Sequence, residues 1–243
     1  RTDMGWSAIS RADYTVVTNL TEGEEMGVSA IAVADGVVYG YDMNNQLFSL
    51  DLGDFSRTAI GESISDFAIE EYLYYSGMTG VYEPSDFRFE VRDMAYDPAD
   101  ELMLFIGTVQ LYNAAAGEYS EITGGNSIYA VDLETGEVFV LYTFEDNDYI
   151  FGLAVDQEGG VYFYSTFNDY IYKLDLYTGL STQIISLQSQ SLYGTSDEGV
   201  REAMYFDELT GLIYMTFTSN GRMYRMLSID PTTGALTILS DIG

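Results

Sequence analysis

The chain has 243 residues, enough for one large all-β domain, and its 47% apolar residues with 22 Tyr and 13 Phe indicate a globular fold. Its 39 acidic residues against 9 basic ones give a formal net charge of −30, which disfavours nucleic acid and anionic membranes as partners. The absence of cysteine excludes disulfides and thiolate metal sites, and the absence of histidine removes the commonest general base.

The N-terminal part of the chain is predicted to consist of hairpins. Residues 5–20, GWSAISRADYTVVTNL, form one candidate that would pair with another segment. Residues 28–60 hold two more, which turn near Asp35 and Asp51. Residues 67–77, FAIEEYLYYSG, are interpreted as a looser hairpin of the kind that turns near Asp35. No segment of 12 residues has a convincing helical period.

Three longer units follow, at 90–144, 150–187 and 201–240. Each unit begins with a hairpin that turns at an aspartate and ends with one built on an Asp-x-x-Thr-Gly motif. The first turns lie at Asp97, Asp156 and Asp207, and the motifs at 132–136, 175–179 and 230–234. Residues 207–211, DELTG, also match the motif. Residues 109–127 are expected to be an insertion that forms an exposed loop or a short extra hairpin.

The repeated motif is typical of a tight turn between strands. An aspartate side chain accepts backbone N–H groups two residues on, and glycine supplies the positive φ that closes the hairpin. The motif aspartates recur 43 and 55 residues apart, and two hairpins make a four-stranded unit. This period predicts a single all-β propeller over residues 1–243, with five four-stranded antiparallel blades and a range of four to six. A β-sandwich is the alternative, although it would show cleaner alternation of apolar and polar residues.

The alternating hairpins, such as LAVDQEGGVYFY and IYKLDLYTGLSTQI, resemble the repeats of quinoprotein-like and YVTN-type β-propellers. The resemblance extends over residues 28–240 and implies the propeller fold. Quinoprotein dehydrogenases carry a tryptophan in each blade, whereas this chain has only Trp6. The resemblance therefore implies no cofactor chemistry.

Few kinds of catalysis remain open. A Ser–His or Cys–His nucleophile is excluded, and no phosphate-binding glycine motif is present. A pair of carboxylates is enough for glycoside hydrolysis. Because the repeated turn aspartates are interpreted as structural, the candidates are the acids outside the repeat: Asp86, Asp93, Asp146 and Asp148.

Two acidic segments offer oxygen ligands for calcium. They are FEDNDY, with Glu145, Asp146 and Asp148, and DMNNQ, with Asp42 and Asn44. Neither follows the EF-hand spacing, so a solvated turn is the competing interpretation. No other cofactor is expected.

Tyrosines divide into two groups. Those at repeated strand positions, including Tyr214, are interpreted as packing between blades. Those outside the repeat are candidates for ligand binding, because tyrosine combines a flat apolar ring with a hydroxyl group. They are Tyr82, Tyr112, Tyr119, Tyr149, Tyr170 and Tyr193.

These features favour a non-enzymatic, monomeric recognition or scaffolding domain that binds a glycan or a protein. We expect it outside the cell or on a bacterial surface, as a segment of a longer protein. No run of 18 apolar residues is present, so membrane insertion is not expected. The rival prediction is a carboxylate-based glycoside hydrolase or lyase on a propeller scaffold.

Overall fold

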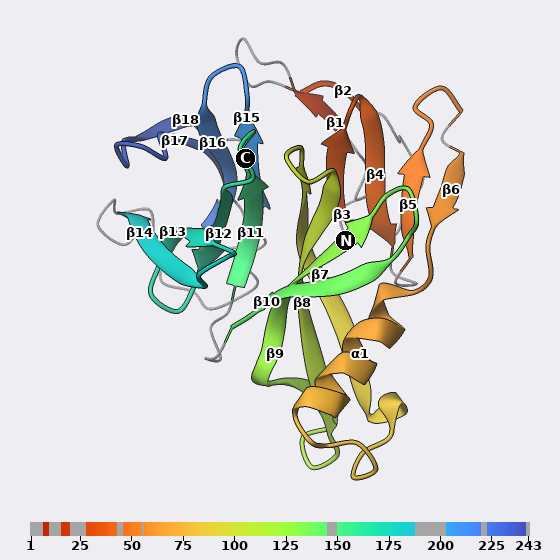
Figure 1. Cartoon of the computed structure of the whole chain (residues 1–243). Helices are drawn as coiled ribbons and strands as arrows, with labels where there is room; N and C mark the ends of the chain where they lie inside the picture. The colour runs from red at the N-terminus through yellow and green to blue at the C-terminus, as the bar shows by residue number, and fades with distance from the viewer. Residues whose placement is uncertain are drawn as a thin grey trace.

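A computed structural model describes residues 7–9, 16–19, 28–42, 46–54, 56–144, 150–187, 203–219 and 223–241. Four antiparallel four-stranded sheets form a ring, which makes the fold a β-propeller (Figure 1). The sheets coincide with the four units predicted from the repeats. The all-β propeller prediction is therefore confirmed.

Within every blade the strands follow one another along the chain as a meander. Blade 1 consists of β3 (Val28–Ala34), β4 (Val37–Asp42), β5 (Leu47–Leu50) and β6 (Arg57–Ile60). Blade 2 consists of β7 (Phe87–Asp97), β8 (Leu102–Asn113), β9 (Glu118–Asp132) and β10 (Val138–Thr143). Blade 3 consists of β11 (Ile150–Val155), β12 (Val161–Ser165), β13 (Tyr170–Asp175) and β14 (Leu180–Ser186). Blade 4 consists of β15 (Ala203–Asp207), β16 (Leu212–Ser219), β17 (Met223–Ile229) and β18 (Leu236–Asp241).

The N-terminal segment contributes a separate two-stranded sheet. β1 (Ser7–Ile9) pairs antiparallel with β2 (Val16–Asn19), so the hairpin expected at 5–20 is confirmed as a pairing. This sheet has no further strand among the described residues. The described part of the chain therefore makes four complete blades, within the predicted range but below the best estimate of five.

The Asp-x-x-Thr-Gly turns have the predicted chemistry. In the turn after β9, Asp132 Oδ1 accepts hydrogen bonds from the backbone N–H groups of Glu134 and Thr135, both at 2.8 Å. Gly136 has a φ of +74° and donates its N–H to the Asp132 carbonyl at 2.8 Å. Asp175 and Asp230 bond their own turns in the same way.

In Figure 1 the first strands β3, β11 and β15 lie toward the centre of the view, and the last strands β6, β14 and β18 lie at its edges. β7 packs between β3 and β11, and β11 also packs against β15. The strands next to these first strands are apolar on both faces because each blade stacks on the next. β12, for example, is buried at all five of its positions.

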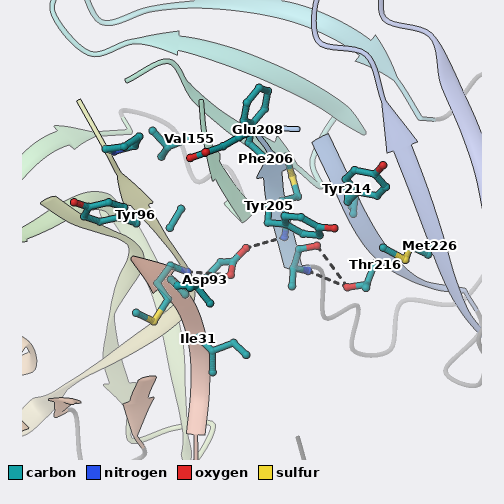
Figure 2. Close-up of a pocket in the computed structure, with 18 residues that line it drawn as sticks. Ile31, Asp93, Tyr96, Val155, Tyr205, Phe206, Glu208, Tyr214, Thr216 and Met226 are labelled. Carbon is teal, nitrogen blue, oxygen red and sulfur yellow. Dashed lines mark hydrogen bonds between the residues drawn. The ribbon is translucent and has the colours of Figure 1, made fainter. Parts of the chain in front are cut away.

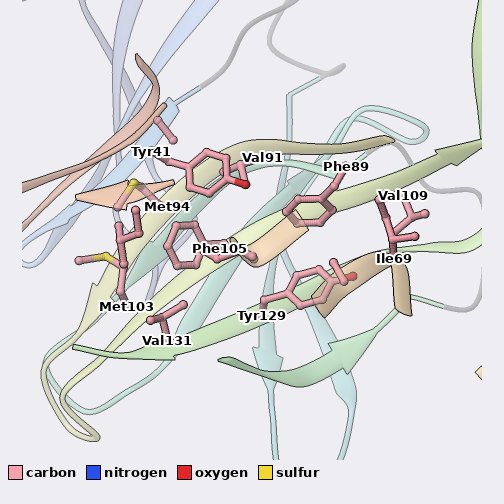
Figure 3. Close-up of a cluster of buried hydrophobic side chains, with 14 of the residues drawn as sticks. Tyr41, Ile69, Phe89, Val91, Met94, Met103, Phe105, Val109, Tyr129 and Val131 are labelled. Atoms are coloured by element: carbon pink, nitrogen blue, oxygen red, sulfur yellow. The ribbon is translucent and has the colours of Figure 1, made fainter. Parts of the chain in front are cut away.

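Three hydrophobic clusters fill the spaces between blades. The first joins blade 1 to blade 2, where the Tyr41 and Phe105 rings meet edge to face with centroids 5.8 Å apart (Figure 3). The second joins blade 2 to blade 3, and the third joins blade 3 to blade 4. Among the described residues, no such cluster joins blade 4 to blade 1.

The prediction of a loose hairpin at residues 67–77 is wrong. Most of this segment belongs to a helix, α1 (Ile64–Tyr75). Its buried residues Ile64, Ala68, Ile69 and Leu73 recur at helical spacing and pack on the hydrophobic face of β7 and β8. The run FAIEEYLYY also alternates well enough to suggest a strand, and packing against blade 2 decides in favour of the helix.

The insertion expected at 109–127 is an extra hairpin. It continues β8 and β9 beyond the ring and closes at Asn113, whose side chain accepts the N–H of Ala115 at 3.0 Å. α1 covers this extension next to the ends of β7 and β8 (Figure 1).

Candidate functional site

The same contact closes three of the seams between blades. In each case the glycine of an Asp-x-x-Thr-Gly turn packs on the end of the outermost strand of the preceding blade, or directly after it. A Cβ added to Gly136 would lie 2.5 Å from Gly61 Cα, and one added to Gly234 would lie 2.8 Å from the Ile184 carbonyl oxygen. At Gly179, the Tyr142 ring approaches to 3.3 Å. These turns therefore require glycine for its small size as well as for its positive φ.

The fourth seam lies between blade 4 and blade 1. In the blade 1 turn, the Asp51 N–H donates to the Ser56 carbonyl as the Asp132 N–H donates to that of Glu137, so the position equivalent to Gly136 is residue 55, which lies outside the described residues. Among the described residues, no hydrophobic cluster joins these two blades.

A cavity of about 430 Å³ lies between blade 4 and blade 1, and we call it the seam pocket. Blade 1 contributes Ile31 and Val33 from β3, and blade 4 contributes residues of β15, β16 and β17. β7 and β11 supply the remaining wall (Figure 2). Ile31 is 47% exposed and Val33 is 60% exposed, so blade 1 presents apolar side chains to the pocket rather than burying them.

Asp93 is the buried carboxylate of the pocket wall. It follows a bulge in β7, where the register with β8 shifts between Val91 and Asp93. Its Oδ2 accepts the backbone N–H of Leu153 in β11 at 2.8 Å and that of Met204 in β15 at 3.0 Å. Its Oδ1 accepts the N–H of Met94 at 2.9 Å. One side chain of blade 2 thus binds blades 3 and 4.

Burial raises the pKa of Asp93 to about 7, and the three N–H donors act in the opposite direction. Both oxygens are occupied by backbone donors from the protein itself. Asp93 is therefore placed to hold blades together, and it is not placed as a free general base for a substrate.

Aromatic rings form the blade 4 side of the pocket. The rings of Tyr205 and Tyr214 are stacked, with centroids 5.2 Å apart and planes 14° apart. Tyr205 is 47% exposed, and Figure 2 shows its ring in the middle of the lining residues. Phe206 and Met226 also line this side. The wall is thus aromatic and apolar, and Tyr205 is its exposed ring.

The lining of the pocket also carries negative charge. Glu208, which is exposed, lines the pocket together with Tyr96 of β7. The Tyr96 hydroxyl donates to Asp35 Oδ2 at 3.4 Å, and partial burial followed by the charge of Asp35 raises the Tyr96 pKa. No lysine or arginine belongs to the described lining.

The structure places the described tyrosine candidates outside the seam pocket. Tyr112 and Tyr119 are cross-strand partners on the extension of blade 2, with ring centroids 5.3 Å apart. Tyr82 packs edge to face on Phe87, and Tyr170 lies in β13 beside Tyr172. Tyr149 and Tyr193 lie outside the described residues.

Of the acidic candidates that lie in the described ranges, only Asp93 lines the pocket. Asp86 accepts the N–H of Glu83 at 3.0 Å in a short turn, and Asp42 accepts the N–H of Gln46 at 3.1 Å. The calcium candidates Asn44, Glu145, Asp146 and Asp148 lie outside the described residues. Within the described ranges, no group of three or more acidic residues is arranged to hold a metal ion.

The aromatic wall does not follow from the sequence pattern. Tyr214 stands at a repeated strand position, which predicts packing between blades, and nothing in the pattern distinguishes Tyr205. Both residues line a pocket between blade 4 and blade 1, which no hydrophobic cluster of the described residues joins. The one signal in the sequence is Asp93, an acid outside the repeat.

Helices of the described ranges are all too short or too polar to cross a membrane. The chain matches no protein-family model and no curated protein. β-propeller proteins are among the solved structures to which it is similar, and they support the propeller fold without showing membership of a particular family.

Two examples have TM-scores above 0.5. The nidogen/laminin complex has a TM-score of 0.54 at 12% identity, over 96% of this chain and 72% of the other. A protein of unknown function from Bacteroides thetaiotaomicron has a TM-score of 0.53 at 15% identity, over 87% of this chain and 42% of the other. At these identities the likeness shows the fold alone.

Proposed function

We propose that this chain is a non-enzymatic recognition module that binds a protein partner by taking an apolar group of that partner into the seam pocket. The observation that carries the proposal is the lining of the pocket. Its walls are aliphatic and aromatic, and its buried carboxylate Asp93 is occupied by three backbone N–H donors. Largely apolar pockets of a few hundred Å³ with few polar groups are typical of binding sites.

A protein partner fits the lining better than a glycan does. Sugars present many hydroxyl groups, and each needs a hydrogen-bonding group when it leaves water. The seam pocket is lined in part by Ile31, Val33 and Met226, which offer no hydrogen bond to a sugar hydroxyl. The nidogen/laminin complex, a similar fold, is itself a complex of two proteins.

We also propose that the domain lies outside the cell or on a bacterial surface, where a net charge of −30 keeps it from self-association. Surface labelling of intact cells that express the parent protein is the test. Labelling confined to broken cells would contradict this part of the proposal.

The test of recognition compares two tryptophan variants. Ala203→Trp places a large ring in the pocket, whereas Leu180→Trp places the same ring on β14, where Leu180 is 69% exposed. Peptides selected from a displayed library on the native chain are expected to lose at least about tenfold in affinity for Ala203→Trp, as expected for filling an anchor pocket. Their affinity for Leu180→Trp is expected to stay unchanged.

A glycan panel incubated with the native chain separates the alternatives. Sugar released into solution would support the carboxylate-based hydrolase or lyase and overturn the proposal. Sugar retained without release, and lost in Ala203→Trp, would replace the protein partner with a glycan. Equal affinity of selected peptides for both tryptophan variants would show that the seam pocket is not the binding site.

A further inference from the structure

We infer that the group taken by the seam pocket is an organic cation, meaning an alkylated ammonium or the basic side chain of a partner. This inference rests on the proposed recognition function and names the chemistry that the same pocket selects. It follows from three features of the lining: aromatic faces, carboxylates and the absence of basic residues in the described wall.

Aromatic faces attract cations because the ring quadrupole places negative potential above and below the ring plane. In the seam pocket, Tyr205 stacks on Tyr214, and Tyr96 lies on the opposite side of the lining (Figure 2). Since Tyr205 remains 47% exposed after stacking, part of its ring is available to a ligand. Tyrosine rings on two sides of a cavity are the usual arrangement for recognising quaternary ammonium groups.

The carboxylates add a negative electrostatic potential at the pocket. Glu208 lines the pocket, and Asp35 accepts a hydrogen bond from the hydroxyl of Tyr96, which also lines it. The net charge of −30 gives the whole surface the same sign. A cation is therefore attracted at long range, whereas an anion is repelled and finds no basic side chain in the described lining.

The remaining wall explains why the cation must carry apolar groups. A strongly hydrated ion such as sodium loses its water shell on entry, and Ile31, Val33 and Met226 offer nothing in exchange. An alkylated ammonium buries its methyl groups against these side chains while its charge faces the rings. At about 430 Å³, the cavity has room for such a group together with an apolar stem.

The experiment is a calorimetric titration with choline and with 3,3-dimethyl-1-butanol, which has the same shape but no charge. We expect choline to bind about tenfold more tightly than the alcohol, within the range of a desolvated cation–π contact. High salt is expected to weaken only the choline complex. Peptides that carry trimethyllysine or arginine, titrated in parallel, distinguish a protein side chain from a free small molecule.

Three variants assign the effect to residues. Tyr205→Leu keeps an apolar surface but removes the ring, and it should lower choline affinity about tenfold. Glu208→Gln keeps the shape and removes one charge, so it should lower the affinity a few fold. Tyr177→Leu removes a tyrosine that is 98% exposed on blade 3, and it should have no effect.

The outcomes separate this inference from the proposed function. Equal affinity for choline and the alcohol would overturn the cation inference and leave an apolar recognition pocket. The cation inference also fails if neither compound nor either basic peptide binds while library-selected peptides still lose affinity in Ala203→Trp. Failure of every ligand, with no selected peptide sensitive to Ala203→Trp, would overturn both.

Discussion

The carboxylate of Asp93 accepts a hydrogen bond from the backbone N–H of Met204, 111 residues further along the chain, at 3.0 Å. The same oxygen accepts the N–H of Leu153 from the intervening blade at 2.8 Å. Three blades thus meet at one buried side chain, next to the seam pocket. Substitution of Asp93 therefore tests how much this side chain contributes to the stability of the ring.

Replacement of Asp93 by leucine should destabilise the protein by about 3 kcal/mol at pH 6. The side chain keeps its approximate size, but the N–H groups of Leu153 and Met204 lose their acceptor, and a buried unsatisfied donor costs about 1–3 kcal/mol. Urea unfolding measures the change. Glu134→Leu removes an exposed carboxylate and should change the free energy of unfolding by less than about 0.5 kcal/mol. Equal effects of the two variants would contradict the assigned role.

Asp93 should also make stability depend on pH. Its folded pKa of about 7 lies above its ordinary value of 3.8, so the folded state binds a proton more tightly than the unfolded state. The contribution of this group is complete below about pH 4 and is lost as the pH rises through 7. The full span corresponds to about 4 kcal/mol.

The comparison with Asp93→Asn isolates this group from the other acids. The difference in unfolding free energy between the native chain and Asp93→Asn should shrink, or change sign, between pH 4 and pH 8. Unfolding curves at several pH values measure it. A difference that stays constant across this range would show that Asp93 titrates at its ordinary pKa.

Two glycines of blade 4 should differ in their tolerance of alanine. Gly211 and Gly234 end turns of the same Asp-x-x-Thr-Gly sequence, with φ values of +66° and +69°. Among the described residues, nothing lies within 4 Å of a Cβ at Gly211, whereas the Ile184 carbonyl lies 2.8 Å from one at Gly234. Alanine should cost about 1 kcal/mol at Gly211, for the left-handed backbone alone.

At Gly234 the cost should be about 2–3 kcal/mol, because the backbone of blade 3 must also move. Thermal or urea unfolding of the two single variants provides the measurement. Similar losses would mean that the glycine is required only for its backbone conformation, and that the turn does not close the seam.

Removal of the buried charge of Arg92 should lower the free energy of unfolding markedly. Its side chain is 4% exposed, pairs with Glu121, and lies over the Phe151 ring at 4.4 Å. Burial raises the pKa of Glu121, and Arg92 opposes that shift. Arg92→Met should therefore destabilise the protein by about 3 kcal/mol, because it leaves a largely buried carboxylate without its cation.

The comparison is Lys173→Met, which removes the cation that pairs with Asp156. The Lys173 side chain is 44% exposed. We expect a loss below about 1 kcal/mol there, as for most pairs near solvent. The double variant Arg92→Met/Glu121→Leu should recover part of the stability lost in Arg92→Met. No recovery would mean that Arg92 acts through packing on Phe151 rather than through charge.

The sequence by itself determined the elements whose causes are local. The aspartate and glycine of each Asp-x-x-Thr-Gly turn interact within five residues, so their pattern predicts a hairpin wherever it occurs. Repetition of two hairpin types then fixed the four-stranded unit and the propeller class. The four units at 28–60, 90–144, 150–187 and 201–240 each correspond to one observed blade.

Only the tertiary structure decided what depends on distant contacts. Residues 64–75 form a helix because an apolar stripe finds the face of blade 2, a partner that local alternation does not reveal. The seam pocket lies between blades 4 and 1, which no hydrophobic cluster of the described residues joins, and the repeat pattern does not single out this pair of blades. Repeat units look alike in sequence, and the ring distinguishes them only through the surfaces against which each one packs.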